Sequence, residues 1–139
     1  MNRFRELVDA WARGETDLAP ITGLLGVWPV SVGEGEAVVE MEAGERFHNA
    51  MGTLHGGVIL DLADVAMGVA MATVLEEGEG FATLQTSVAY LRAVVAGRLE
   101  ARARLVHRGR TVGHLECDVV DDGDRALARV TSVCAIVVY

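Results

Sequence analysis

The longest hydrophobic run of the sequence lies near the middle of the chain, from Val58 to Leu75, and its only charged residues are Asp61 and Asp64. The run does not alternate and is rich in Ala, Leu and Met, which favours a helix over a strand. At about 1.5 Å per residue, this helix would be about 27 Å long. Because a surface helix has a polar face and this run has almost none, the pattern predicts a helix that is buried on most sides.

Much of the remaining chain alternates between apolar and polar residues, which is typical of strands with one wet face. After the helix, the pattern predicts four strands, over residues 81–95, 98–107, 111–120 and 125–138. Before the helix, residues 26–42 predict two strands, or one strand and a hairpin, around the Gly-Glu-Gly-Glu turn at 33–36. Pro29 places the first of these strands at a sheet edge or a bulge, because proline cannot donate to a strand ladder.

Glycines and other turn formers mark the ends of these elements. An amphipathic helix is expected over residues 2–13, and a loop or short helical turn around a proline over residues 17–25. Residues 43–53 predict a loop, and the Glu-Gly-Glu-Gly cluster at 77–80 should end the central helix. Turns between the later strands are expected at Gly97, 108–110 and 122–123, of which the last is an Asp-Gly hairpin signal.

This order of elements predicts an α+β domain in which an antiparallel sheet packs on one long helix. The whole chain, residues 1–139, is expected to form a single domain, with residues 1–25 covering the core. The last strand is apolar on both faces from Val133 to Val138, so it should be central or at an interface. A small sheet with one helix leaves apolar surface uncovered, and a homodimer is therefore expected.

Charge and cysteine content exclude several classes of protein. The formal net charge is −8, and all 12 basic residues are Arg, so nucleic acid and anionic membranes are poor partners. Residues 91–139 hold 8 Arg against 6 acids, so a phosphorylated ligand would be better received there, although most of these Arg should lie on exposed strand faces. Two cysteines within predicted strands and the absence of a signal peptide indicate a cytoplasmic setting. The two Asp of the central run argue against a membrane span, at about 2.5–3.5 kcal/mol each.

Candidate chemistry is concentrated at the start of the central helix, in the stretch His55-Gly56-Gly57. Two glycines at a helix start let another molecule approach the backbone closely. The first N–H groups of a helix have no acceptor within it, so they suit an oxyanion, with Gly56 the first candidate and Gly57 the second. Two turns later, Asp64 supplies a carboxylate that, if buried, must find donors or raise its pKa. Asp61 lies one turn before Asp64 on a similar side of the helix.

The pattern formed by Asn49, Gly52, Leu54-His55-Gly56-Gly57 and Leu62-Ala63-Asp64 resembles the hotdog-fold acyl-CoA thioesterases of the phenylacetic-acid-degradation type. The resemblance covers most of the chain, from about residue 24 to residue 138. It implies a curved antiparallel sheet wrapped around one long helix. It also implies hydrolysis of a small aromatic or medium-chain acyl-CoA to the free acid and coenzyme A, with no metal or cofactor beyond the coenzyme A of the substrate.

The same resemblance implies roles for individual residues. Asp64 would attack the thioester carbonyl or activate water, and the sequence does not choose between these mechanisms. Gly56 would polarise the carbonyl through its backbone N–H. Asn49 and Thr83 would orient the reacting groups, and His55 would support the loop or bind near the thioester. Asp61, whose counterpart in the family is variable, is interpreted as a solvated or structural acid.

The resemblance also implies where coenzyme A binds and how the subunits assemble. The nucleotide of coenzyme A is expected near the turn at 108–110, through Arg108 and Arg110, because Arg pairs well with phosphate; Arg92 is a further option. In the resembling enzymes the site lies between two subunits, with the acid from one and the oxyanion donor from the other. The resemblance therefore implies a homodimer that assembles into a homotetramer.

Two other functions stay open at this level. One is a non-catalytic acyl-CoA binding or sensing module on the same fold, against which the joint presence of Asn49, Gly56 and Asp64 argues. The other is a dehydratase or hydratase, which usually needs an Asp–His pair that these residues do not supply. The four His lack zinc-site spacing, and no Gly-x-Ser-x-Gly or phosphate-binding loop occurs, which argues against a zinc site, an α/β-hydrolase esterase and a nucleotide-binding enzyme.

Overall fold

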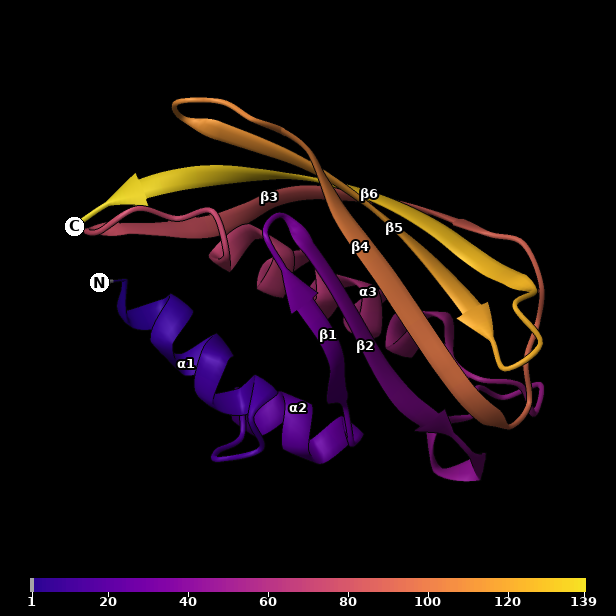
Figure 1. Ribbon diagram of the computed structural model, residues 1–139. Helices are drawn as coiled ribbons and strands as arrows, with labels where there is room; N and C mark the ends of the chain where they lie inside the picture. The colour runs from indigo at the N-terminus through magenta and orange to yellow at the C-terminus, as the bar shows by residue number, and fades with distance from the viewer. Residues whose placement is uncertain (1) are drawn as a thin grey trace.

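The computed structural model describes residues 2–139, so Met1 of the expected domain lies outside the described residues. The strands are β1 Trp28–Gly33, β2 Glu36–Ala43, β3 Glu79–Tyr90, β4 Gly97–Arg108, β5 Val112–Asp121 and β6 Ala126–Val138. The helices are α1 Arg3–Ala12, α2 Pro20–Leu25 and α3 Gly56–Ala72, with a short 3₁₀ turn, η1, at Glu45–Phe47. All six strands form one antiparallel sheet in the order β1-β2-β4-β5-β6-β3, which curves around α3 (Figure 1). The predicted α+β class and the hotdog arrangement are confirmed.

Helix α3 forms the centre of the core and packs against β2, β4 and β5. Its buried residues are Ile59, Leu62, Ala63, Ala66, Met67, Val69, Ala70, Met71 and Ala72. The helix starts at Gly56, before the apolar run, and ends at Ala72, before Leu75. At its end, the hydroxyl of Thr73 donates to the Ala70 carbonyl and accepts the Gly35 N–H, both at 2.7 Å. Within residues 2–139, no helix is long and apolar enough to cross a membrane.

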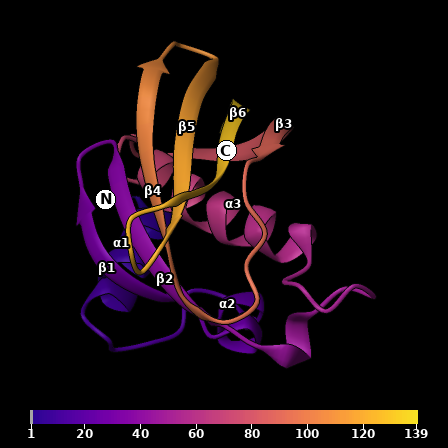
Figure 2. The same ribbon diagram turned by 90° about the vertical axis from the view of Figure 1, so that its right-hand side faces the viewer.

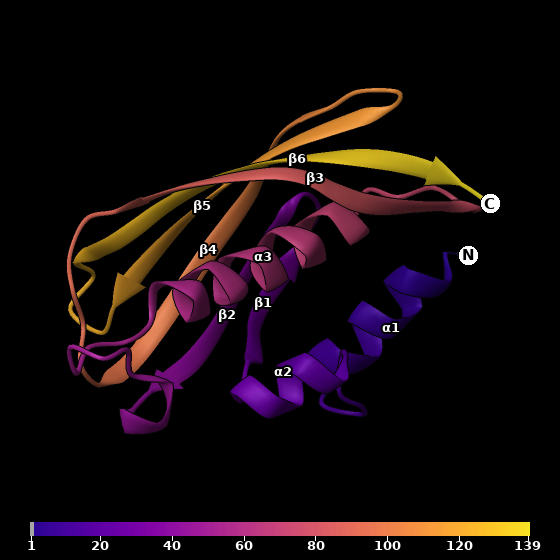
Figure 3. The same cartoon turned by 180° about the vertical axis from the view of Figure 1, so that it is seen from behind.

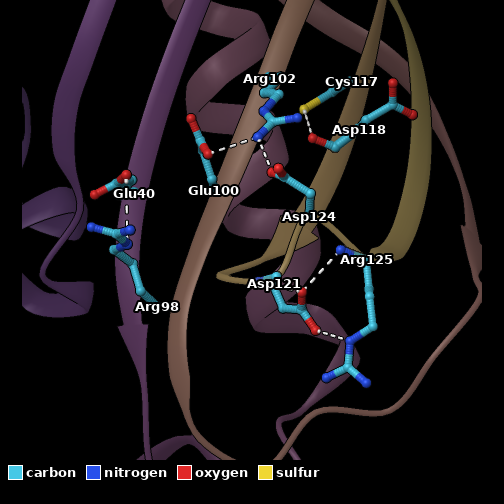
Figure 4. Close-up of polar contacts among 10 residues, drawn as sticks. Glu40, Arg98, Glu100, Arg102, Cys117, Asp118, Asp121, Asp124 and Arg125 are labelled. Atoms are coloured by element: carbon cyan, nitrogen blue, oxygen red, sulfur yellow. Dashed lines mark hydrogen bonds and ion pairs between the residues drawn. The ribbon is translucent and has the colours of Figure 1, made fainter.

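Strand β4 shows how the predicted alternation builds the sheet. Its inner face is buried against the helix through Leu99, Ala101 and Ala103. On its outer face, Arg102 contacts Glu100 at 3.0 Å and Asp124 at 2.6 Å, and Arg98 lies 3.8 Å from Glu40 (Figure 4). Exposed ion pairs of this kind contribute only about 0–1 kcal/mol each. Apolar burial on the inner face therefore supplies most of the stability of this strand.

The two edges of the sheet are β1 and β3, which lie on opposite sides of α3 (Figure 2). Strand β1 contains Pro29, and its register with β2 shifts between Pro29 and Ser31. This strand is therefore an edge strand that contains a bulge. Strand β6 lies between β5 and β3. The prediction that the apolar last strand lies inside the sheet is thus confirmed, and β3 remains as an edge that pairs only with β6 within residues 2–139.

Strand β3 differs most from its predicted boundaries. It starts at Glu79, inside the cluster expected to be a turn, because Glu79 already pairs with Val138 of β6. It ends at Tyr90 instead of residue 95. The segment after Tyr90 leaves the sheet, and its Val94 carbonyl accepts the Leu54 N–H at 2.8 Å. This bond holds the segment beside the loop that leads into α3.

The N-terminal part packs on one side of the core. Helix α1 buries Val8 and Trp11 and lies below α3 in Figure 3, in contact with α3 and β1. Asn2 caps α1 with its side-chain oxygen, and its Nδ2 donates to the Glu76 and Glu79 carbonyls at 2.7 and 2.8 Å. Where the sequence predicts a loop or a short helical turn, the structure has the short helix α2. The bonds from Asn2 to the Glu76 and Glu79 carbonyls fix α1 to the turn between α3 and β3.

Both cysteines lie in the core as free thiols. Cys117 and Cys134 are buried on β5 and β6, and they form no disulfide. Burial raises the pKa of the Cys117 thiol to about 12, which keeps it protonated and unreactive.

Candidate active site

The start of α3 presents a free backbone donor. His55 is the N-cap of the helix, and its Nδ1 accepts the Gly57 N–H at 2.9 Å. The Gly57 N–H, the second of the two predicted oxyanion donors, is therefore already bonded within the protein. The Gly56 N–H, in contrast, donates to no acceptor within residues 2–139. Because the first N–H groups carry the positive end of the helix dipole, Gly56 is left as the donor for an oxyanion.

A residue that the sequence did not indicate lies on the other side of this helix start. Tyr90, at the end of β3, donates its hydroxyl to the Gly56 carbonyl at 2.7 Å. A Cβ at position 56 would lie only 2.8 Å from Tyr90 Cζ, so the ring fits here because residue 56 is a glycine. The two residues are 34 positions apart, and only the fold brings them together. Periodicity and local motifs therefore carry no signal for this contact.

Asn49 uses most of its amide group to shape its own loop. Its Oδ1 accepts the Met51 N–H at 2.9 Å and the Thr53 N–H at 3.2 Å, and its Nδ2 donates to Thr53 Oγ1 at 2.9 Å. The backbone N–H of Asn49 also bonds to the Thr53 carbonyl at 2.8 Å. One N–H of the side-chain amide has no acceptor among the described residues. The visible effect of Asn49 is to hold the turn that leads into His55.

Asp64 lies midway along α3 with its side chain at the surface of the protomer, and the fold brings the predicted Thr83 to it. Partial burial raises the pKa of Asp64, the negative charge of Asp61 raises it further, and a hydrogen bond with the Thr83 hydroxyl opposes both. Partial burial also raises the pKa of Asp61. Thr83 Oγ1 also lies 3.8 Å from the sulfur of the buried Cys134. A raised pKa makes the Asp64 carboxylate a stronger base than an ordinary Asp.

Gly56 and Asp64 share one helix but lie far apart along it. They are eight positions apart, which corresponds to about 12 Å at about 1.5 Å per residue. Groups that act on one reacting carbonyl must each lie within about 3–3.5 Å of it. A single protomer therefore does not bring this donor and this acid to the same carbonyl.

The predicted phosphate-binding arginines lie at the opposite end of the protomer from the start of α3 (Figure 1). Arg108 is partly buried, pairs with the carboxylate of Glu79 and donates to the Gly109 carbonyl at 2.9 Å. Arg110 is exposed on the β4–β5 turn. Arg92 follows the end of β3, and its backbone N–H bonds to the Leu127 carbonyl at 3.3 Å. Within one protomer, the structure separates Arg108 and Arg110 from Gly56.

Comparison with known proteins places this fold in a family. The profile described as the thioesterase superfamily matches residues 51–128. The chain belongs to the thioesterase superfamily. One relative is the 1,4-dihydroxy-2-naphthoyl-CoA hydrolase of Listeria monocytogenes, which is 33% identical over 114 residues, 82% of this chain and 91% of that protein. Another is the acyl-coenzyme A thioesterase PaaI of Escherichia coli, 30% identical over 107 residues, 75% of this chain and 73% of that protein.

Solved structures agree with this thioesterase assignment. A phenylacetic acid degradation-related protein from Ralstonia eutropha JMP134 superposes with a TM-score of 0.85 at 29% identity, over 93% of this chain and 98% of that chain. The predicted resemblance to thioesterases of the phenylacetic-acid-degradation type is confirmed, and the chain is a thioester hydrolase. Within residues 2–139, no group of three or more His, Cys, Asp or Glu side chains is arranged to hold a metal ion.

Proposed function

We propose that this thioesterase hydrolyses acyl-CoA thioesters to the free acid and coenzyme A. The observation that carries the proposal is the unused Gly56 N–H at the positive end of a helix that also bears the Asp64 carboxylate. When water or a carboxylate adds to a thioester, negative charge moves to the carbonyl oxygen. A preorganised N–H donor at that oxygen is worth about 2.7–4 kcal/mol. The names of two relatives, a CoA hydrolase and an acyl-CoA thioesterase, support coenzyme A as the thiol.

Asp64 is the group that we propose to act on the carbonyl carbon. Its carboxylate either adds to that carbon, giving an anhydride that water cleaves, or takes a proton from water as the water adds. In both routes the C–S bond breaks, the thiolate of coenzyme A leaves and takes up a proton, and one water is consumed as the free acid forms and the Asp64 carboxylate is restored. Thr83 would hold the Asp64 carboxylate through its hydroxyl. Asn49 and His55 would hold the loop and the helix start that aim the Gly56 N–H.

The separation of about 12 Å between Gly56 and Asp64 favours a site shared by two subunits. Strand β3 offers the interface, because it is an open edge, and natural proteins seldom leave such an edge uncovered. Antiparallel pairing of β3 with the same strand of a second copy would continue the sheet and set the two α3 helices side by side in opposite directions. Asp64 of one protomer would then face the start of α3 in the other. The family resemblance extends this proposal to a tetramer of two such dimers.

For the acyl group, we propose a small aromatic or medium-chain substituent. Gly68 follows Asp64 by one turn, and Phe81 Cζ lies 3.3 Å from the place of a Cβ at Gly68. The Phe81 ring in turn packs edge-on against Phe4, with ring centroids 5.6 Å apart. Aromatic surface therefore begins one turn beyond the carboxylate, where an apolar acyl group would gain from burial. The naphthoyl group in the name of one relative is of this kind.

Product analysis tests the proposed reaction. The purified protein is incubated with phenylacetyl-CoA, hydroxybenzoyl-CoA, octanoyl-CoA and a 2-enoyl-CoA, and free thiol and acid are both quantified. We expect thiol release matched by an equal amount of free acid from at least one thioester. Hydration of the enoyl-CoA without thiol release would assign a hydratase instead. Saturable binding of acyl-CoA without turnover would assign a sensing module, and either result would overturn the proposal.

A further inference from the structure

We propose that Tyr90 is a positioning residue, which together with His55 fixes the peptide group between Gly56 and Gly57 and so aims the Gly56 N–H at the reacting carbonyl oxygen. The catalytic consequence of this inference rests on the proposed function. Its structural part does not, because it concerns the free protein.

Two side chains hold the two ends of one peptide group. The carbonyl of Gly56 accepts the Tyr90 hydroxyl at 2.7 Å, and the N–H of the same peptide group, on Gly57, donates to His55 Nδ1 at 2.9 Å. A peptide group is planar, so bonds at its carbonyl and at its N–H together fix its orientation. We call this arrangement of His55, Tyr90 and the Gly56–Gly57 peptide group the peptide clamp.

The clamp restrains two consecutive glycines in the first turn of α3. Gly56 and Gly57 lack side chains, so their dihedral angles are less restricted than those of other residues. The free Gly56 N–H shares its Cα with the clamped peptide group, and rotation about that Cα would swing the N–H away from its target. A donor stabilises an oxyanion most when it needs no reorientation during the reaction. Holding the neighbouring peptide group therefore preserves the effect of the donor.

The segment that follows Tyr90 is bonded to the loop that precedes His55. After Tyr90, the Val94 carbonyl accepts the Leu54 N–H at 2.8 Å, and the Val95 carbonyl bonds to the ring of His48 at 2.8 Å. These bonds join the end of β3 to the loop that carries His55. Tyr90 and the start of α3 are thus parts of one connected structure, and the ring can hold its position beside Gly56.

Because Tyr90 is partly exposed, its role in positioning the backbone can be tested apart from its role in stability. Within one protomer, half of the Tyr90 side chain is exposed, so its hydroxyl would otherwise bond to water, and its loss would leave no buried group of the protomer unsatisfied. Tyr90→Phe keeps the ring over Gly56 and removes only the bond to the carbonyl. We therefore expect this substitution to change stability little and turnover substantially.

Kinetics of Tyr90→Phe give the first test. We expect kcat to fall about tenfold, or about 1.4 kcal/mol of barrier, with KM changed less than about twofold. The matched control is Tyr139→Phe. Tyr139 follows β6, and its ring lies over Gly80 near the start of β3, so a tyrosine ring covers a glycine there as well. This control should retain the wild-type kcat. A rise in KM alone for Tyr90→Phe would make Tyr90 a substrate contact and overturn the positioning role.

Amide hydrogen exchange of the free protein gives a readout that does not depend on turnover. Measured by NMR, the Gly57 amide should exchange at least about fivefold faster in Tyr90→Phe than in the wild type, while the amides in the middle of α3 keep their protection. Unchanged exchange at Gly57 would overturn the clamp, whatever the kinetics show. Faster exchange with an unchanged kcat would overturn its catalytic role. If the wild type hydrolyses no acyl-CoA, the proposed function fails, and exchange alone decides whether the clamp exists.

Discussion

If Gly56 of one protomer and Asp64 of the other act on the same carbonyl, two inactive variants should restore activity in a mixed dimer. Asp64→Asn removes the carboxylate and keeps the shape of the side chain. Gly56→Pro removes the N–H, and proline suits the first position of a helix because its φ is already close to helical. The added Cβ would lie 2.8 Å from Tyr90 Cζ and must displace that ring, so the melting temperature of this variant is measured as well.

The expected magnitudes follow from the symmetry of the dimer. Each variant homodimer should lose about a hundredfold or more in kcat, which corresponds to about 2.7 kcal/mol. In a mixed dimer, one of the two shared sites lacks both groups, and the other keeps both. The mixed dimer should therefore have about half of the wild-type activity, against about 1% or less for either homodimer.

The assay uses co-expression of the two variants with different affinity tags, sequential purification of the mixed dimer, and thiol release from the best acyl-CoA. Asp64→Asn carrying both tags is the matched control and should stay inactive. If the mixed dimer is no more active than the homodimers, the donor and the acid serve separate sites or lie within one protomer. That result would refute the argument from the separation of about 12 Å along α3.

Three further outcomes follow from the site. Because partial burial and Asp61 raise the pKa of Asp64, kcat/KM should fall as the pH drops through that raised value. Asp61→Asn should move this acid limb of the pH profile to lower pH. A pH profile unchanged by Asp61→Asn would exclude Asp64 as the titrating group. The folded state holds the Asp64 proton more tightly than the unfolded chain, so stability is lost as the pH rises from the ordinary value of 3.8 through the raised one. Asp64→Asn should therefore raise the melting temperature at pH 7 but not at pH 3, and calorimetry showing the opposite order would contradict the shift. Arg108→Gln should lower the melting temperature, because Arg108 pairs with Glu79. Arg110→Gln should leave the melting temperature unchanged and raise KM for acyl-CoA, because Arg pairs well with phosphate. An unaltered KM would remove Arg110 from the binding site.

The sequence predicted the fold well because periodicity is a local signal. The unbroken apolar run indicated α3, and the alternation over residues 98–107 matched β4. The ends of elements were less accurate, since contacts between distant residues decide them. Pairing with Val138 draws Glu79 into β3, and the His55 cap starts α3 before the apolar run begins.

The site was predictable in type but not in detail. A short motif indicated Gly56 and Asp64, and the separation between them could be counted along one helix. The sequence could rank Gly56 above Gly57 but could not show that Gly57 donates to His55, because that bond depends on the geometry of the helix cap. It also could not show that Tyr90 reaches Gly56, since that contact depends on how far β3 extends before it leaves the sheet.

The most direct test of the catalytic role of Asp64 is the kcat of Asp64→Asn on the best acyl-CoA, measured by thiol release at pH 8 beside Asp61→Asn. The two substitutions make the same chemical change one turn apart on α3. We expect Asp64→Asn to lower kcat by about a hundredfold or more, or about 2.7 kcal/mol, while Asp61→Asn keeps most of the activity. A kcat for Asp64→Asn within about fivefold of the wild type would remove Asp64 from the chemistry.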